Sequence, residues 1–326
     1  MDLTGLDGKC IAVTGGMGLI GSAIVDLLLI YGKTSKIFIL ANSEAKFLDR
    51  YSGYEKVGFV EYNALEKFNI DLAVDYIIHC AGIASPELYV EQPVETMLTN
   101  ILGIKDLLEY AKDNQVERVL YVSSSEIYGR RENGDSFVES EYGIVDLDEI
   151  RSSYPVAKRA SEMLCKSYTS QYGVDSVIVR PGHIYGPTVN EKDKRISSEF
   201  AIKAAKGDKL IMKSSGMQKR SYCYSVDAAV QILTVLLYGK MGEAYNIGND
   251  SVTSIREMVE MYAKYGEVAC EVVEPTVGEV KAFNPMNHSV LSNEKVKALG
   301  YSDAFTAEEG LEHTVRILKE ILSDKE

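Results

Sequence analysis

Four polar residues in a row close an apolar run of the sequence, and they are the first sign of chemistry. Val119–Val122 is predicted to be a buried strand, and Ser123, Ser124, Ser125 and Glu126 follow it directly. A buried carboxylate without a partner costs on the order of several kcal/mol, and the sequence shows no evident partner for Glu126. We therefore interpret Glu126 as a functional group, the alternative being a carboxylate that caps the next turn.

A tyrosine and a lysine four residues apart are candidates for proton transfer. Tyr154 and Lys158 would share one face at the start of a predicted helix, and Pro155 suits its first turn. An ammonium group beside a phenol stabilises the phenolate and lowers the pKa of the phenol. This spacing alone also fits a surface helix. We favour the catalytic interpretation because the serine-bearing strand end and a glycine-rich segment precede the pair in the chain.

The glycine-rich segment is "VTGGMGLIGS", which follows the first predicted strand and opens the first predicted helix. Gly16, Gly18 and Gly21 fit the pattern GxGxxG, and Gly15 stands one position earlier. Such glycines permit a tight turn and a close approach of the backbone to a pyrophosphate, which the helix N-terminus then attracts. The segment predicts dinucleotide binding.

The residue that follows the second predicted strand bears on the choice of dinucleotide. An acidic residue is expected there to bind the ribose of NAD, but the sequence has Asn42, with Lys46 nearby. We interpret Asn42 as the ribose partner and favour NAD. NADP stays open, because no carboxylate would repel its 2′-phosphate.

Short β-branched runs alternate with helical stretches over the first half of the chain. This order predicts a parallel sheet with helices on both faces: an α/β, Rossmann-type doubly wound domain with a smaller C-terminal α/β substrate domain. We expect the dinucleotide-binding domain at 1–183 plus about 219–248, and the second domain at about 184–218 and 249–326. Strands are predicted at 10–16, 36–42, 57–64, 74–82, 116–126 and 175–182, and helices at 19–32, 93–115, 157–173 and within 190–207.

Composition restricts the class of protein. The chain has 326 residues and a formal net charge of −13, which argues against nucleic acid as the main partner. Its five cysteines form no CxxC motif, so we expect reduced core thiols in a cytoplasmic protein. The four scattered histidines predict no metal site, and neither a signal peptide nor a membrane-spanning segment is expected.

Together, the glycine-rich segment, the serine-bearing strand end and the Tyr154–Lys158 pair resemble the extended short-chain dehydrogenase/reductases, the NAD-dependent epimerase/dehydratase family. The resemblance runs from about Lys9 to Leu318 and is strongest to members that act on nucleotide sugars. UDP-glucuronate decarboxylases (UDP-xylose synthases) are the most similar group. The segments that carry the resemblance are "HCAGIASPELYVEQPVETMLTNILG", "VSSSEIYG", "SSYPVAKRASE", "RPGHIYGP", "DKRISSEFAIKAAKGDKL" and "QKRSYCYSVDAA".

The resemblance implies a role for each catalytic candidate. Tyr154 would remove the proton of the sugar 4-hydroxyl, Lys158 would tune Tyr154 and bind the nicotinamide ribose, and Ser124 would hydrogen-bond the same hydroxyl. A hydride would pass from C4 to the nicotinamide and leave a 4-keto sugar. Arg195 matches an arginine near the sugar carboxylate, although by itself it reads as a solvated loop charge.

The two residues after Ser124 separate the reactions within the family. Sugar 4,6-dehydratases carry an Asp–Glu pair there, and simple 4-epimerases usually have no Glu. Ser125 and Glu126 match the decarboxylases, whose 4-keto intermediate is a β-keto acid that loses CO2. A UDP-sugar 4-epimerase or another nucleotide-sugar dehydratase or epimerase is the alternative, and a non-catalytic dinucleotide-binding protein a minor one.

The resemblance also assigns binding residues and a partner. His183 replaces the usual substrate-binding Asn, Asn63 replaces an adenine-contacting Asp, and a second pyrophosphate-binding arginine is replaced around Asn287. A homodimer is expected through the helices around Pro93–Asn114 and Tyr154–Tyr172. The cofactor-binding candidates are Gly15, Gly18, Leu19, Ile20, Gly21, Asn42, Asn63, Ala64, Cys80, Ala81, Tyr154, Lys158 and Pro181. The candidates for UDP-sugar binding are Ser85, Ser125, His183, Arg195 and Arg220.

Overall fold

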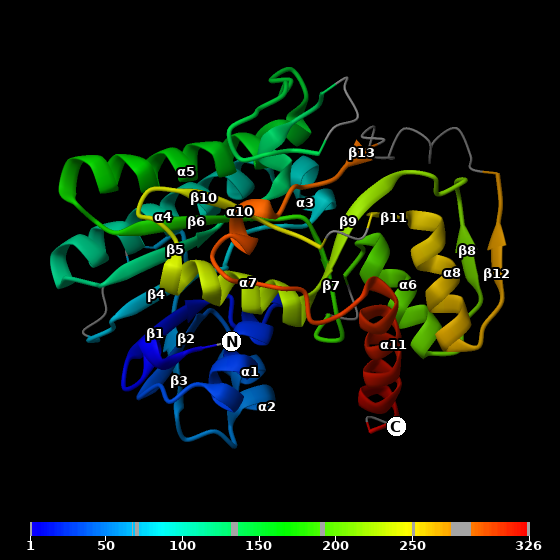
Figure 1. Cartoon of the computed structure of the whole chain (residues 1–326), viewed down its shortest axis with the longest axis horizontal. Coiled ribbons are helices and arrows are strands. Elements are labelled where there is room, and N and C mark those ends of the chain that lie inside the picture. The colour runs from blue at the N-terminus through cyan, green and yellow to red at the C-terminus, as the bar shows by residue number, and fades with distance from the viewer. Residues whose placement is uncertain are drawn as a thin grey trace.

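The computed structural model describes residues 2–66, 68, 72–131, 136–189, 193–249, 252–274 and 288–324. Its centre is a seven-stranded sheet in the order β10-β6-β5-β4-β1-β2-β3, in which every neighbouring pair is parallel (Figure 1). The strands are β1 (Cys10–Thr14), β2 (Lys36–Ala41), β3 (Val57–Glu61), β4 (Tyr76–His79), β5 (Arg118–Val122), β6 (Ser176–Pro181) and β10 (Ala244–Ile247).

Alternate residues of each strand face two separate cores. On β1, Ile11 and Val13 join one core, whereas Ala12 joins the other. The first core is covered by α1 (Leu19–Tyr31), α2 (Glu44–Tyr51) and α7 (Ser225–Tyr238), and the second by α4 (Pro93–Asn114) and α5 (Ser153–Tyr172). A sheet buried on both faces explains why its strands read as continuous apolar runs. The predicted doubly wound α/β fold is confirmed.

The seventh strand of this sheet was not predicted. β10 has only four residues and includes Asn246, so its pattern gives little signal. The Asn246 side-chain amide donates to the carbonyls of Phe137 and Ser292, both at 2.9 Å, and its backbone N–H donates to the Glu139 carboxylate at 2.8 Å. The strand is therefore fixed by polar contacts with two distant segments as well as by its pairing with β6.

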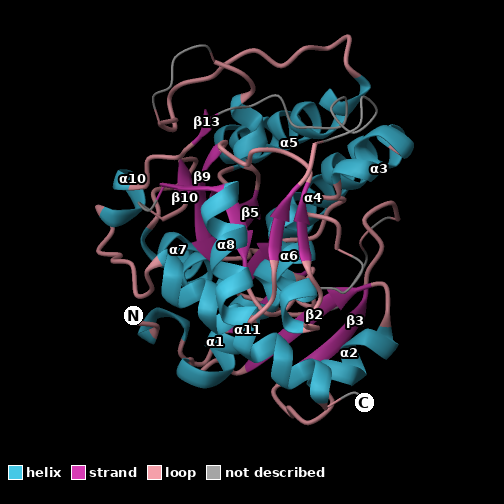
Figure 2. Cartoon of the chain, turned by 90° about the vertical axis from the view of Figure 1, so that its right-hand side faces the viewer, coloured by secondary structure: helices cyan, strands magenta, loops and turns pink. Residues whose placement is uncertain are grey.

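A smaller α/β unit follows, and it faces the viewer in Figure 2. In it β9 pairs with three strands, β8 pairs with β12, and three helices enclose a third core. The segment 219–248 was expected to belong to the dinucleotide-binding domain. Its α7 and β10 do complete the first unit, whereas its strand β9 belongs to the second. The domain boundaries remain a prediction. The elements are β7 (His183–Tyr185), β8 (Leu210–Met212), β9 (Lys219–Tyr224), β11 (Val252–Ser254), β12 (Cys270–Val272), β13 (His288–Ser289), α6 (Ile196–Ala205), α8 (Ile255–Gly266) and α11 (Ala307–Ser323).

Short helices complete the described chain. They are η1 (Thr4–Leu6), α3 (Pro86–Glu91), η2 (Ser125–Tyr128), η3 (Ile150–Ser152) and α10 (Glu294–Lys297). No helix in the described ranges has both the length and the apolar composition to cross a membrane. All five cysteines are free, but Cys270 is exposed, so the prediction that all five are core thiols is wrong for Cys270, which lies on the short strand β12.

A buried arginine organises the outer edge of the central sheet. Arg180 on β6 is fully buried and donates twice to the Glu162 carboxylate, at 3.0 and 2.7 Å. It also donates to the hydroxyls of Tyr128 and Tyr142 and to the carbonyl of Glu139, at 2.8 to 3.0 Å. These bonds use all five guanidinium N–H groups. Arg180 thus ties α5, η2 and the 139–142 loop to one strand.

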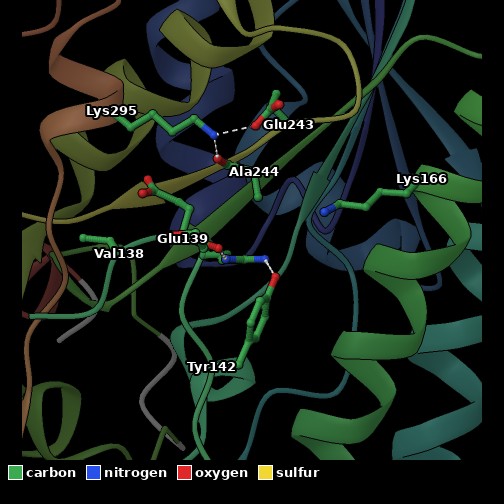
Figure 3. Close-up of a pocket in the computed structure, with 9 residues that line it drawn as sticks. Val138, Glu139, Tyr142, Lys166, Glu243, Ala244 and Lys295 are labelled. Atoms are coloured by element: carbon green, nitrogen blue, oxygen red, sulfur yellow. Dashed lines mark hydrogen bonds and ion pairs between the residues drawn. The ribbon is translucent and has the colours of Figure 1, made fainter. Parts of the chain in front are cut away.

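A pocket of about 360 Å³ adjoins Arg180 (Figure 3). Lys295 points toward Glu243 across it and donates to that carboxylate at 2.8 Å and to the Ala244 carbonyl at 2.7 Å. Lys166 reaches in from α5 on the other side. Because Arg180 and Lys295 are both held in ion pairs, we regard this pocket as part of the structural network around Arg180.

Candidate active site

The glycine-rich turn between β1 and α1 forms a cradle for an anion. Gly15 has a φ of +66°, and its carbonyl accepts the N–H of Gly18 at 2.9 Å. A Cβ on Gly21 would lie 2.3 Å from that carbonyl oxygen, so only glycine lets the helix start so close to the turn. No side chain caps the N-terminus of α1, which begins with Leu19 and Ile20. Its first N–H groups are thus suited to a pyrophosphate.

The end of β4 lies against this cradle. The Thr14 hydroxyl bonds Nδ1 of His79 at 2.7 Å and accepts the backbone N–H of Ala81 at 3.0 Å. A Cβ on Gly15 would come within 3.0 Å of the same Ala81 nitrogen and 3.1 Å of Cys80. The structure thus brings Cys80 and Ala81 to the cradle through Thr14 and His79, which sequence reasoning did not single out.

The remaining cofactor candidates lie at the ends of parallel strands, where doubly wound folds bind their ligands. Asn42 is exposed directly after β2. Asn63 follows β3, where its side chain donates to Glu66 at 2.7 Å and accepts a backbone N–H at 3.1 Å, next to the buried Ala64. Pro181 is the last residue of β6.

Tyr154 and Lys158 are both buried in the first two turns of α5. The Lys158 ammonium donates to the Val122 carbonyl at 2.9 Å and lies 5.8 Å from the centre of the Tyr154 ring. Burial lowers the pKa of Lys158 to about 8. Burial, and then the charge of Glu126, raises the pKa of Tyr154 to about 12, against the opposing effects of the Ser124 and Tyr89 hydroxyls and of Arg195. At neutral pH and without ligands, Tyr154 is therefore a neutral phenol, and the expected lowering of its pKa beside Lys158 is not seen.

The serine-bearing strand end forms the short helix η2. Ser124 is its N-cap, and its hydroxyl oxygen accepts the N–H of Glu126 at 3.2 Å; Ser125 is buried in its first turn. The Glu126 carboxylate accepts two hydrogen bonds from the terminal nitrogens of Arg151, at 3.0 and 3.1 Å. Glu126 thus has the partner that the sequence did not reveal. The only signal was the position of Arg151, three residues before Tyr154.

Tyr89 connects this ion pair to Tyr154. The two tyrosine rings stack with centroids 4.2 Å apart and an angle of 5° between their planes, and the Arg151 guanidinium lies 5.7 Å from the centre of the Tyr89 ring. The Ser153 hydroxyl donates to the Tyr89 carbonyl at 3.1 Å. These contacts fix α3, and Ser85 at its N-cap, against the start of α5.

The second unit supplies three polar groups. His183 on β7 pairs in register with Tyr222 on β9, and burial, followed by the charges of Arg220 and Arg195, lowers the pKa of His183 to about 3. Its Nδ1 is enclosed and has no hydrogen-bond partner within the described residues. Arg220 is buried, which lowers its pKa.

Arg195 is the N-cap of α6 and forms an ion pair with Asp193, with its Nε 2.9 Å from one carboxylate oxygen. Its charge influences both Tyr154 and His183, so these three residues lie within electrostatic range of one another. The change predicted around Asn287 lies outside the described residues, and His288 is described only as the first residue of β13.

Comparison with known proteins identifies the family. The model of the NAD dependent epimerase/dehydratase family matches residues 11–248. UDP-glucuronic acid decarboxylase 6 of Arabidopsis thaliana is 32% identical over 284 residues, covering 84% of this chain and 80% of that protein. Human dTDP-D-glucose 4,6-dehydratase is 27% identical over 325 residues, covering 96% of this chain and 90% of that protein.

A solved structure agrees with these relatives. The UDP-glucose 4-epimerase of Thermus thermophilus in complex with NAD superposes with a TM-score of 0.81 at 27% identity, covering 95% of this chain and 99% of that one. The cradle at Gly15–Gly21 fits the pyrophosphate of this cofactor. The chain is a member of the NAD-dependent epimerase/dehydratase family, with the Rossmann-type fold of the extended short-chain dehydrogenase/reductases and NAD as its cofactor.

Proposed function

We propose that the protein is a UDP-glucuronate decarboxylase. One observation carries the proposal: Ser124 is followed by Ser125 and Glu126, and Glu126 is an ion-paired carboxylate close enough to Tyr154 to raise its pKa. A dehydratase needs an acid at position 125 to protonate the leaving hydroxyl, and Ser125 cannot serve. A plain 4-epimerase has no need of a carboxylate at position 126.

Each residue has a role in this reaction. NAD would be held by the cradle at Gly15–Gly21 and would supply the hydride acceptor for C4 of the sugar, and then the hydride donor that reduces the ketone again. Tyr154 would act as a phenolate to take the proton of the 4-hydroxyl, and Ser124 would hydrogen-bond the same oxygen. The Lys158 ammonium, 5.8 Å from the centre of the Tyr154 ring, would stabilise that phenolate. The C6 carboxylate then lies β to a ketone, so its bond to C5 breaks, CO2 leaves, and the electron pair moves toward the C4 oxygen.

Decarboxylation must be completed by adding a proton to C5. We assign this proton transfer to Glu126: its carboxylate would first take up a proton from solvent, loosening its pair with Arg151, and would then pass that proton to C5. Arg195 would orient the sugar carboxylate before it leaves. Arg220 and His183 would bind the diphosphate and the sugar. Arg220 suits a diphosphate because its planar guanidinium can donate two parallel hydrogen bonds. The presence of Ser124, Tyr154 and Lys158 together argues against a non-catalytic binding protein.

We also propose a homodimer in the cytoplasm. The outer faces of α4 and α5 expose Val94, Leu98 and Met163 by 61%, 42% and 62%, which would suit packing against a second copy. Free thiols at all five cysteines suit a reducing compartment. Light scattering on a size-exclusion column tests the dimer, and a monomeric mass at micromolar concentration would contradict it.

The reaction is tested by incubating the protein and NAD with UDP-glucuronate labelled with ¹³C at C6. We expect labelled CO2 and a UDP-pentose, with one deuterium at C5 when the solvent is D2O. UDP-glucose is the matched control, because it differs only in having a hydroxymethyl group at C6. Conversion of UDP-glucose to its 4-epimer, without CO2 release from UDP-glucuronate, would establish the 4-epimerase alternative instead.

A further inference from the structure

Glu126 presents an electrostatic problem for the proposed substrate. Its backbone N–H donates to the Ser124 hydroxyl, and its partner Arg151 lies against the Tyr89 ring that stacks on Tyr154, so the carboxylate lies near the position where C4 of the sugar would react. The substrate carries a second carboxylate at C6, two bonds from C4. Like charges held near one another in a partly desolvated site repel each other, and an unpaired Glu126 would therefore select against an anionic sugar.

We propose that Arg151 is a specificity-determining residue that neutralises Glu126 and so lets the site accept a sugar with a carboxylate. The inference rests on the proposed function and adds to it a residue outside the set of catalytic candidates. Arg151 binds both oxygens of Glu126, at 3.1 and 3.0 Å. A pair joined by two hydrogen bonds holds the carboxylate in one orientation and offsets part of its charge at the same time.

The position of Arg151 is itself fixed from a second side. Its guanidinium lies 5.7 Å from the centre of the Tyr89 ring, which stacks on Tyr154. The side chains of Arg151 and Glu126 remain 36% and 26% exposed, so the pair lies at the margin of the buried site, where a substituent of a bound sugar could approach it. Arg195 pairs with Asp193 and not with Glu126. Arg151 is therefore the cation that offsets Glu126.

The test compares two nucleotide sugars that differ at C6. Binding of UDP-glucuronate and UDP-glucose to the NAD-loaded protein is measured by calorimetry in a Tyr154→Phe background, which prevents turnover. We expect Arg151→Met to weaken UDP-glucuronate binding about tenfold or more and UDP-glucose binding less than about threefold. Arg151→Lys should have an intermediate effect on UDP-glucuronate binding, since lysine keeps the positive charge but cannot donate two parallel hydrogen bonds to the carboxylate. Arg130→Met is the matched control, because Arg130 is an exposed arginine that pairs with Asp146 and Glu149 instead.

A double variant separates neutralisation from direct contact with the sugar. If Arg151 acts through Glu126, then Glu126→Gln combined with Arg151→Met restores UDP-glucuronate binding to within about threefold of the Tyr154→Phe protein. An equal loss for both sugars in Arg151→Met, or no restoration in the double variant, would overturn the inference. Binding of UDP-glucuronate without CO2 release by the wild-type protein overturns the proposed reaction alone. The absence of any UDP-glucuronate binding overturns both.

Discussion

Two arginine–glutamate pairs in this molecule are each joined by two hydrogen bonds but differ in geometry and surroundings. Arg180 binds Glu162 through Nε and one terminal nitrogen, whereas Arg151 binds Glu126 through both terminal nitrogens. Arg180 and Glu162 have side chains that are 0% and 7% exposed, whereas those of Arg151 and Glu126 are 36% and 26% exposed. Arg180 uses its remaining N–H groups on two tyrosines and a carbonyl. In the described part of the chain, the hydrogen bonds of Arg151 go to Glu126 alone.

The difference shows how one interaction can either fix a fold or prepare a site. A buried pair whose arginine already uses every N–H group cannot bind a ligand. Removing one member of such a pair strongly lowers the free energy of unfolding. A pair at the margin of the site contributes little to stability, but it controls the charge that a ligand meets.

The largest effect is expected at the buried pair. Arg180→Met would leave the Glu162 carboxylate buried without its cation, so we expect the free energy of unfolding to fall by about 3–5 kcal/mol. Urea denaturation followed by circular dichroism measures the loss. Glu162→Leu added to Arg180→Met should recover part of it. An unfolding free energy within about 1 kcal/mol of the wild type would refute a structural role for Arg180.

The exposed pair should respond in catalysis rather than in stability. Glu126→Gln removes the proposed proton donor to C5, so turnover of UDP-glucuronate should fall about 100-fold or more, with the free energy of unfolding changed by less than about 1 kcal/mol. Initial rates of UDP-pentose formation give the first quantity and urea denaturation the second. Unchanged turnover would remove Glu126 from the mechanism.

Lys158 extends the comparison to a buried cation whose hydrogen bond goes to a backbone carbonyl, that of Val122, and not to a carboxylate. Its pKa falls to about 8 in the folded protein, so the unfolded chain binds the proton more tightly between about pH 8 and pH 10. The free energy of unfolding should therefore rise with pH in this window and be lowest below it. Relative to Lys158→Met, the wild type without ligands should be less stable by roughly 3 kcal/mol at pH 7, and the gap should narrow by pH 10. Denaturation of both proteins across this range measures it, and a gap independent of pH would contradict the shifted pKa.

The smallest effect is expected for the stability of Arg151→Met. A pair that is about one-third exposed should contribute less than about 1 kcal/mol to the free energy of unfolding, even though the variant discriminates against anionic sugars. Thermal denaturation of Arg151→Met beside Arg180→Met gives the most direct contrast. If both variants lost equal stability, the two pairs would be equivalent and the distinction drawn between them would be wrong.

How much the sequence predicts depends on the separation of the residues that make a feature. The glycine turn and the Tyr154–Lys158 pair lie within short segments, so their spacing alone places them on the elements where the structure has them. The six strands that read as continuous apolar runs were also predicted. The family resemblance added candidate roles that neither spacing nor composition carries.

Features built from distant residues did not emerge from the sequence. Arg151 meets Glu126 across 25 positions, and Tyr89 lies 62 residues before Arg151 in the chain. The contact between Thr14 and His79 spans 65 positions. Such contacts depend on how the strands are ordered in the sheet, and no local pattern encodes that order. The sequence did not predict β10 for a different reason: the strand has only four residues, and the polar contacts of Asn246 help to stabilise it.

These contacts of Asn246 also have a consequence for synthesis on the ribosome. Residues 137–139 follow η2 and bind Asn246, whose side chain also binds Ser292, close to the end of the chain. By contrast, the glycine cradle lies between β1 and α1, which are consecutive in the chain, so its turn depends on no residue near Asn246 or Ser292. The segment behind Glu126 cannot complete its hydrogen bonds until the chain through Ser292 has emerged, so a nascent chain would acquire the cofactor cradle well before a finished catalytic centre.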